Sequence, residues 1–294
     1  MSYKMVKPSG IPGNFGEIWK KPTMKLKKFA PLLLCLFLSF STIAQFDSTQ
    51  DSPYKTSWKK DGIWLGTSLG LNAVGFVLVQ NIEPLTEAQV QALDKDDVPK
   101  IDRWLAGRYS KEADDLSYYP FYGSFAVPFI MMLTDDYRGH AGQLSLLFVE
   151  SMATTGALFT ITAGSIHRSR PLTYNEDLPF DQRSEGSSRR SFFAGHTAAT
   201  ASATFFAAKI FNDFNPDSAA RPYVWTAAAL IPAWVGYLRS KAGKHFLTDN
   251  ILGYGIGALS GILIPELHKK EDPDFSFYPS YGKEYKGVSL LYRF

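Results

Sequence analysis

The segment Arg239–Asp249 reads Arg-Ser-Lys-Ala-Gly-Lys-His-Phe-Leu-Thr-Asp and combines an arginine, a histidine and an aspartate at short spacing. It places His245 six residues after Arg239 and four residues before Asp249. The uncharged run that follows, Asn250–Pro265, predicts a helix. If that helix already includes His245, the i, i+4 spacing puts the histidine and the aspartate on one face, where the carboxylate can accept one imidazole N–H.

This spacing favours phosphate chemistry. Fixing one imidazole nitrogen makes the other a better nucleophile or base. Arg239 adds a planar, permanently charged group that suits phosphate. The alternative is a solvated loop in which the three residues are merely neighbours, and the pattern by itself would arise by chance in about one chain of this length in a hundred.

Two stretches upstream strengthen the interpretation: Arg168-Ser169-Arg170-Pro171 and Ser191-Phe192-Phe193-Ala194-Gly195-His196. In the order Arg-Pro, Gly-His and Arg-x5-His-x3-Asp, the chain resembles the type 2 phosphatidic acid phosphatase superfamily over about residues 61–268. That superfamily includes lipid phosphatases, bacterial class A acid phosphatases and vanadium haloperoxidases. The resemblance implies an all-α fold and an enzyme that acts on phosphoric esters.

The sequence departs from the motifs of the superfamily at several positions. Those motifs run Lys-x6-Arg-Pro, Pro-Ser-Gly-His and Ser-Arg-x5-His-x3-Asp. The lysine of the first motif falls at Ala163, the Pro-Ser of the second at Phe193 and Ala194, and the serine of the third at Leu238. The chain therefore lacks one expected cation and one expected hydroxyl donor.

The resemblance assigns the catalytic roles residue by residue. His245 is the nucleophile that forms a phosphohistidine, and Asp249 holds its ring. His196 is the general acid for the leaving oxygen and then the base that activates water. The two histidines should rest in different protonation states, His245 neutral and His196 charged.

Phosphate binding falls to arginines and to the start of a helix. Arg170 and Arg239 would clamp the phosphate, and Gly195 lets the backbone approach where a helix begins. We expect Arg168 or His167 to supply the charge that Ala163 lacks, against the alternative of a solvated loop arginine. No metal or other cofactor is implied, because arginines and N–H groups take its place.

Three functions stay open at this point. The first is a metal-independent phosphatase for a phosphomonoester or diphosphate, with a phosphorylated lipid or a small phosphomonoester as substrate. The second is a vanadate-dependent haloperoxidase, because the same pocket can hold vanadate. The third is a degenerate relative that binds lipid phosphates without turnover.

The bulk composition excludes other classes. The chain has 294 residues, a formal net charge of +3 and a single cysteine. No basic run is long enough for a nucleic-acid footprint, and one cysteine forms neither a disulfide framework nor a cysteine metal site.

The N-terminal part predicts export. Residues 1–23 are rich in Pro and Gly and are interpreted as an upstream leader, and residues 24–44 have the basic start, short apolar core and small residues of a signal peptide. A cytosolic tail before a signal anchor is the alternative. Residues 45–60 form a polar linker, and Cys35 lies in the segment that we expect to be removed.

Six apolar segments predict a six-helix bundle over residues 61–268, with the active site built from loops and helix ends. They are Gly62–Ile82, Tyr118–Leu133, Gln143–Ile166, His196–Phe211, Tyr223–Leu238 and Asn250–Leu267. Thr86-x-x-Gln89 is a capping box for a short surface helix. The tail, residues 269–294, could make one or two strands.

Membrane attachment remains ambiguous at this stage. Several segments are long enough to span a bilayer, and they would favour a lipid substrate. Six true spans after a cleaved signal would put the motif loops on the cytoplasmic side, whereas membrane phosphatases of this superfamily usually work on the outer face. We expect an exported protein on the periplasmic face of a bacterial membrane, integral or peripheral.

Four further residues invite a role. Glu150 lies inside an apolar helix and is expected to be a buried partner of an arginine or part of a polar path. His268 ends the last helix, where positive charge suits the helix dipole. Arg189 and Arg190 either recruit an anionic substrate or form a plain surface pair.

Overall fold

The computed structural model describes residues 51–270, 275–282 and 286–292. The expected leader (residues 1–23), the signal peptide (residues 24–44) and Cys35 lie outside the described residues. The segment boundaries proposed from the sequence stay predictions.

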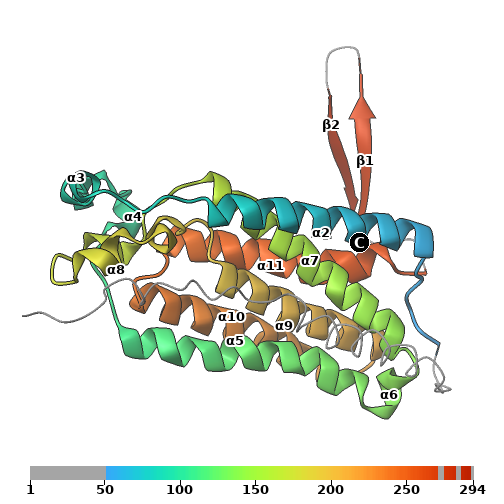
Figure 1. The fold of residues 1–294 in the computed structure, drawn as a ribbon. Coiled ribbons are helices and arrows are strands. Elements are labelled where there is room, and N and C mark those ends of the chain that lie inside the picture. The colour runs from blue at the N-terminus through green and yellow to red at the C-terminus, as the bar shows by residue number, and fades with distance from the viewer. Residues whose placement is uncertain (1–50, 271–274, 283–285, 293–294) are drawn as a thin grey trace, which may run out of the picture. The chain divides into compact units, whose positions relative to one another are not determined.

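Six helices of 20 to 25 residues dominate the described part of the chain, which confirms the all-α bundle. They are α2 (Trp58–Gln80), α5 (Lys111–Met132), α7 (Ala141–Ser165), α9 (Gly195–Phe214), α10 (Arg221–Lys241) and α11 (Leu247–Leu267) (Figure 1). Short helices join them: α3 (Glu87–Gln91), α4 (Lys100–Arg103), α6 (Asp135–Arg138) and α8 (Phe180–Ser184). Four-residue 3₁₀ turns cover Pro171–Tyr174 and Gly186–Arg189, and a three-residue one covers Lys95–Asp97.

Local signals place the helix boundaries. The capping box at Thr86 is present, because Thr86 N–H donates to Gln89 Oε1 at 2.9 Å and Gln89 N–H donates to Thr86 Oγ1 at 3.3 Å. Helix α5 begins seven residues earlier than its apolar run predicts. Its first turn is polar, and the Ser110 hydroxyl caps it by accepting from Ala113 N–H at 3.1 Å. Polar capped turns of this kind are invisible to a search for apolar segments.

Helix α9 lies at the centre of the bundle, in contact with α5, α7, α10 and α11, while α2 packs along α7 (Figure 1). Large side chains from α7 and α9 form the main core, among them Leu147, Phe148, Phe206 and Ile210. Most of the other buried positions of α9 hold Ala, Ser or Thr, which allows its neighbours to come close.

A row of glycines on α11 makes the closest of these contacts. A Cβ at Gly253 would lie 2.6 Å from the Ala194 carbonyl oxygen, and one at Gly257 would lie 2.0 Å from that of Ala198. One turn further, a Cβ at Gly261 would lie 2.5 Å from the Ser202 carbonyl oxygen. Only hydrogen side chains fit along this seam, so these glycines set the position of α9 against α11.

The seam gives a first testable prediction. Gly257→Val should lower the free energy of unfolding by about 1–3 kcal/mol or more, because the added carbons overlap the backbone of α9. The matched control is Gly255→Val on the same helix, where a Cβ meets nothing within 4 Å. Thermal unfolding of both purified variants measures the difference. Equal midpoints would show that the two helices can separate without loss.

The lysine inside α9 is neutralised within the bundle. Lys209 Nζ pairs with Asp213 at 2.7 Å and with Glu266 of α11, and its side chain is 7% exposed. The Tyr54 hydroxyl donates to Asp213 at 2.7 Å. A charge that the sequence places in a spanning-length segment is therefore an internal ion pair rather than a contact with solvent.

The C-terminal tail forms a hairpin of β1 (Phe275–Tyr281) and β2 (Lys286–Tyr292). The strands pair antiparallel, with Phe275 opposite Tyr292. The prediction of one or two strands in the tail is confirmed.

Candidate active site

Three segments that are far apart in the chain meet at one end of the bundle. They are the long connection after α7, the start of α9 and the turn between α10 and α11 (Figure 1). Backbone hydrogen bonds join them: Ala194 N–H donates to the Asp249 carbonyl at 3.0 Å, and Leu172 N–H donates to the Gly243 carbonyl at 3.0 Å. The three sequence motifs are therefore held as one unit.

The turn between α10 and α11 depends on Gly243. Its φ is +71°, and a Cβ there would lie 1.9 Å from the carbonyl oxygen of Arg108. Only glycine adopts this conformation in so little space. The turn brings Arg239, at the end of α10, and His245, just before α11, to the same end of the bundle.

His245 is held in one orientation. Its side chain is 2% exposed, and its Nδ1 lies 2.6 Å from the carbonyl oxygen of Ser191. A carbonyl oxygen only accepts, so Nδ1 must carry the hydrogen in the neutral ring. The lone pair is then on Nε2, which is the nitrogen available for attack.

Asp249 does not contact the His245 ring as the i, i+4 spacing suggested. Helix α11 begins at Leu247, so His245 precedes the helix and the spacing does not apply. The Asp249 carboxylate instead accepts from the Ser191 hydroxyl at 2.6 Å and from Phe246 N–H at 2.8 Å. Asp249 thus fixes the residue that binds the ring, and it acts on His245 through Ser191.

Arg168 is occupied by carboxylates and does not favour a role in phosphate binding. One terminal nitrogen donates to Asp249 and to the Thr248 hydroxyl at 3.0 Å, and the other donates to Asp102 at 2.7 Å. The guanidinium also stacks on Phe246, with its central carbon 4.5 Å from the ring centroid. This geometry makes Arg168 a positioning residue for Asp249.

Asp102, a residue that the sequence did not single out, completes this pairing. It is fully buried, and it accepts from Thr248 N–H at 3.0 Å and from the Thr248 hydroxyl at 2.5 Å. Burial alone would raise the pKa of Asp102, but the hydrogen bonds from Thr248 and Arg168 hold it below its ordinary value. The carboxylate is therefore ionised at neutral pH and balances Arg168.

Arg168→Ala should separate positioning from phosphate binding. Removing the cation leaves two buried carboxylates unpaired, which should cost about 3–5 kcal/mol of stability and lower kcat. The inhibition constant for inorganic phosphate should change little in a variant that remains folded, assayed at low temperature. A large loss of phosphate affinity with full stability would instead return Arg168 to the phosphate site.

Arg170 has the opposite character. Its guanidinium has no hydrogen-bond or ion-pair partner among the described residues, and its Nε is buried without a partner. Burial and the neighbouring charges of Arg239 and Arg190 lower the pKa of Arg170 to about 9. The group is still charged at neutral pH, so Arg170 is a buried cation without a paired carboxylate among the described residues.

Arg239 interacts electrostatically with Arg170. It is 3% exposed, donates to Asp114 and to the Ser117 hydroxyl at 3.2 Å, and lies 5.9 Å from the ring centroid of Tyr118. Lys244 Nζ pairs with the same Asp114 at 3.0 Å. Helix α5 therefore contributes a carboxylate that holds two cations in place beside His245.

His196 occupies the first turn of α9. Its ring packs against Phe121 and Tyr118, with centroid distances of 4.4 Å and 5.3 Å. Burial, then the charges of Arg239 and Arg170, lower the pKa of His196 to about 3. The expectation that His196 rests in its charged form is wrong for the free protein, because burial and two nearby arginines disfavour a further positive charge.

The start of α9 is open to an anion. No side chain caps the helix, whose N-cap residue is Ala194. The first N–H groups of a helix have no intrahelical partner. A Cβ at Gly195 would lie 2.7 Å from the ring of Phe159, so glycine is also required for packing.

The mutual electrostatic effects of the four motif side chains show that they lie near one another. Burial is the main cause that lowers the pKa of His245, followed by the charges of Arg170, Arg239 and His196. The same two arginines act on His196. Both histidines therefore lie within the field of both arginines, as a shared anion between them requires.

The missing lysine of the first motif is not replaced locally. Ala163 is fully buried in α7, and among the described residues His167 Nε2 donates to the Gly164 carbonyl oxygen, 3.2 Å away. Lys244, in the turn between α10 and α11, acts electrostatically on His196. Its position directly before His245 is the sequence feature that could have identified Lys244 as a candidate.

Part of the chain matches a known protein family. The model of the PAP2 superfamily matches residues 144–273. Residues 144–273 belong to the PAP2 superfamily. The chain is also similar to a crystal structure of a transmembrane PAP2 type phosphatidylglycerolphosphate phosphatase from Bacillus subtilis. The similarity covers 67% of this chain and 93% of the Bacillus chain, with 22% sequence identity and a TM-score of 0.40. No curated protein matches the chain.

Proposed function

We propose that this PAP2 protein is a metal-independent phosphatase that hydrolyses a phosphomonoester or diphosphate through a phosphohistidine on His245. The observation that carries the proposal is the unbalanced Arg170 guanidinium beside Arg239 and two uncharged imidazoles. Phosphoryl transfer needs cations on the non-bridging oxygens, an in-line nucleophile and an acid for the leaving oxygen. These residues supply each requirement.

The first chemical step forms the phosphoenzyme. Nε2 of His245 attacks phosphorus while the bond to the leaving oxygen breaks, and that oxygen takes the proton of His196. Arg170 and Arg239 hold the equatorial oxygens, together with the N–H groups at the start of α9. The Ser191 carbonyl stabilises the positive ring of the phosphohistidine through Nδ1–H.

The second step returns the enzyme to its starting state. His196, now neutral, removes a proton from water, and the resulting hydroxide attacks phosphorus as the bond to Nε2 breaks. Phosphate leaves, and the proton stays on His196 for the next turnover or departs with the product. Asp249 keeps Ser191 and the backbone of Phe246 in place throughout.

The phosphate itself should bring the proton that His196 needs. In the free protein the pKa of His196 is about 3, so the ring is neutral at pH 7. A bound phosphate anion offsets the charges of Arg170 and Arg239 and raises this pKa. A phosphate monoester also carries a proton of its own below about pH 6.

This arrangement predicts an unusual acid limb. Because the pKa of His245 is well below its ordinary value, its nucleophilic form should persist as pH falls. We expect kcat/KM to stay level or rise between pH 7 and pH 5, where an ordinary histidine nucleophile would lose about tenfold per pH unit below about 6.5. A pH profile of kcat/KM on a phosphomonoester measures this, and a steep fall toward acid would contradict it.

The outer surface supports a lipid substrate. Three helices, α2, α7 and α11, are long and apolar enough to cross a membrane. Large apolar side chains stand exposed on the bundle, including Phe76 on α2, Ile130 on α5, Leu230 on α10 and Ile251 on α11. Exposed apolar area of this extent marks a membrane or protein contact. We place the protein in a bacterial membrane with its site on the periplasmic face.

Lys244 is proposed as the cation that replaces the first-motif lysine. Lys244→Ala should lower kcat/KM by about tenfold to a hundredfold, because a charge beside the phosphate is lost. Lys241→Ala is the matched control, since Lys241 is exposed at the end of the same turn. Initial rates on a phosphomonoester give both values. Equal rates for the two variants would remove Lys244 from the site.

One experiment separates the three functions. Phosphate release from a panel of lipid and soluble phosphates, in the presence of a chelator and blocked by vanadate, is expected for the phosphatase. Vanadate-dependent halide oxidation without phosphate release would select the haloperoxidase. Inactivity in both assays, with lipid phosphates still bound, would select the non-catalytic relative.

A further inference from the structure

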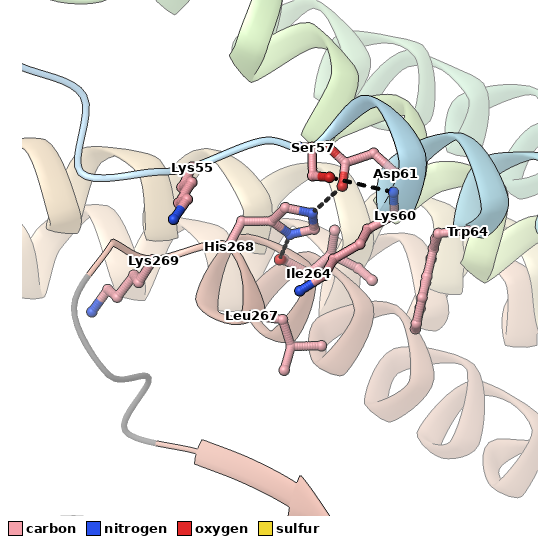
Figure 2. A pocket seen from close by; sticks show the side chains of 9 residues that line it. All are labelled: Lys55, Ser57, Lys60, Asp61, Trp64, Ile264, Leu267, His268 and Lys269. Atoms are coloured by element: carbon pink, nitrogen blue, oxygen red, sulfur yellow. Dashed lines mark hydrogen bonds and ion pairs between the residues drawn. The ribbon is translucent and has the colours of Figure 1, made fainter.

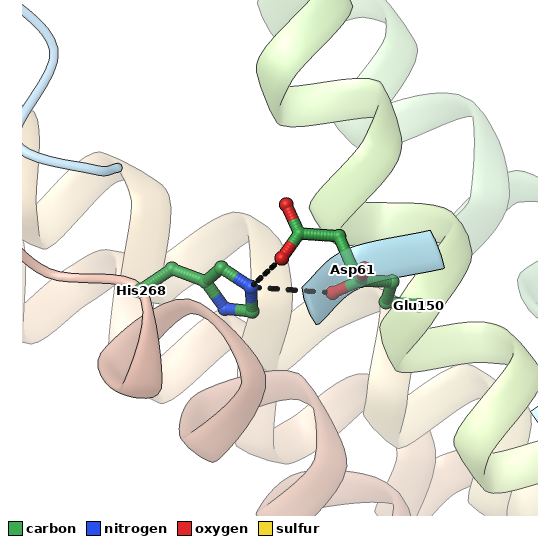
Figure 3. Close-up of side chains that lie close together, drawn as sticks. All are labelled: Asp61, Glu150 and His268. Atoms are coloured by element: carbon green, nitrogen blue, oxygen red, sulfur yellow. Dashed lines mark hydrogen bonds and ion pairs between the residues drawn. The ribbon is translucent and has the colours of Figure 1, made fainter. Parts of the chain in front are cut away.

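A second cluster of charged side chains lies at the other end of α11 from His245. Asp61 comes from the first turn of α2, Glu150 from α7 and His268 from the end of α11 (Figure 3). Their ligand atoms all lie within 4.8 Å of one another. The 21 residues of α11 separate the cluster from the candidate active site by about 30 Å.

The tautomer of His268 points a lone pair at two carboxylates. Its Nδ1 lies 2.7 Å from the Ile264 carbonyl oxygen, so Nδ1 carries the hydrogen in the neutral ring. Nε2 then faces Asp61 Oδ1 at 3.4 Å and Glu150 Oε2 at 3.5 Å. A lone pair and two carboxylates repel one another unless a cation lies between them.

Glu150 needs such a cation most. The residue is fully buried, and neither carboxylate oxygen has a hydrogen-bond partner among the described residues. Burying an uncompensated carboxylate is expensive. The expectation of an arginine partner is wrong, because the group that faces Glu150 is His268.

The spacing suits a metal ion better than a proton. At 3.4 Å, the contact of Nε2 with Asp61 Oδ1 would be a long hydrogen bond with a protonated Nε2, since N–H···O bonds are usually about 2.7–3.2 Å long. Ligands bound at about 2.1 Å around a tetrahedral Zn²⁺ lie about 3.4 Å apart. The separations of Nε2 from Asp61 Oδ1 and Glu150 Oε2, 3.4 Å and 3.5 Å, match that edge.

The surroundings also prepare the ligands. Asp61 Oδ2 accepts from Ser57 N–H at 2.7 Å, which leaves Oδ1 directed at His268 (Figure 2). The Ile264 carbonyl does the same for the imidazole. Outer contacts of this kind orient the ligands of metal sites.

We propose that Asp61, Glu150 and His268 bind one divalent transition-metal ion of the Zn²⁺ class. Two carboxylates and one dication leave the cluster neutral, whereas a protonated His268 would leave one negative charge buried. The ion would join α2, α7 and α11, the three helices that could cross a membrane. Water would take the fourth position from an adjoining cavity of about 320 Å³, which Asp61 and His268 line (Figure 2).

The same cavity holds the competing cations. Lys55, Lys60 and Lys269 line it, and their charges disfavour a metal ion nearby (Figure 2). Glu150 is not among the residues that line the cavity. A lysine ammonium group from the cavity would therefore neutralise Asp61 before Glu150. The experiment must distinguish a bound metal ion from a lysine ammonium group.

The test is metal stoichiometry on the full chain purified in detergent. After chelation and desalting, the wild-type protein titrated with Zn²⁺ should take up one ion per chain, and its unfolding midpoint should rise. His268→Gln and Glu150→Gln should each weaken Zn²⁺ binding by at least about a hundredfold. The matched control, His140→Ala, removes a histidine at the start of α7 and should retain one ion.

A second measurement does not depend on folded variants. X-ray absorption of the Zn²⁺-loaded wild-type protein should show one imidazole nitrogen and oxygen ligands at about 2.0–2.2 Å. Failure of the wild type to bind Zn²⁺ would overturn the proposal and leave a protonated His268 as the cation. Undiminished binding by His268→Gln, or a ligand set without a single imidazole, would overturn it equally.

Discussion

His245→Ala is expected to reduce phosphate release by at least about a thousandfold, because the atom that would receive the phosphoryl group is removed. The loss should appear in kcat and should not be rescued by a higher substrate concentration. Burial makes the fold sensitive at this position, since His245 also binds the Ser191 carbonyl. His245→Asn, which can retain a donor toward that carbonyl, is the second variant.

The phosphoenzyme gives this prediction its decisive readout. Rapid quenching of the wild type with radiolabelled substrate should trap an acid-labile, base-stable phosphate on the protein, and both His245 variants should lack it. His196→Ala should accumulate the label when the leaving group is activated, because its acid is then unnecessary while its base is missing. A label that survives in His245→Asn would move the nucleophile to another residue.

Arg170→Ala should lower kcat/KM by about a hundredfold or more, since it removes a buried cation that is held ready for the phosphate. The variant should fold at least as well as the wild type, because the substitution removes a buried guanidinium that has no partner among the described residues. Arg170→Lys should restore little, since an ammonium cannot provide the two parallel donors of a guanidinium.

The neighbouring arginines supply the comparison. Arg189→Ala should leave kcat/KM unchanged, because Arg189 donates to the Glu83 carbonyl, 3.1 Å away. Arg190→Ala should have an intermediate effect, as its Nε is buried without a partner and its charge acts on Arg170. Inhibition constants for vanadate measure how each of the three substitutions changes anion binding. A wild-type vanadate affinity in Arg170→Ala would contradict the place of Arg170 in the site.

Much of this architecture could be predicted from the sequence because it depends on local signals. Apolar runs marked the six long helices, and Thr86 with Gln89 marked a short one. The order of the three motifs was enough to predict that distant segments meet. Helix α5 was too short in the prediction because its polar first turn, from Lys111, is defined by the cap at Ser110 and carries no apolar period.

The pairing inside the site was not accessible in this way. Arg168 binds Asp102, 66 residues away, and no sequence pattern in either segment predicts this ion pair. Asp249 was assigned to His245 by spacing, and the start of α11 at Leu247 removed that contact. The resting charge of His196 depends on two arginines from other segments, so it follows only from their arrangement in space.

The pairing of Arg168 with Asp102 and Asp249 restricts how the sequence can evolve. Loss of the arginine strands two carboxylates, and loss of Asp102 leaves the arginine to Asp249 alone. We therefore expect substitutions at positions 102 and 168 to occur together, so that the two positions hold either a charged pair or two uncharged residues. Positions 102 and 168 should co-vary among descendants of this protein, although 66 residues separate them in the gene product.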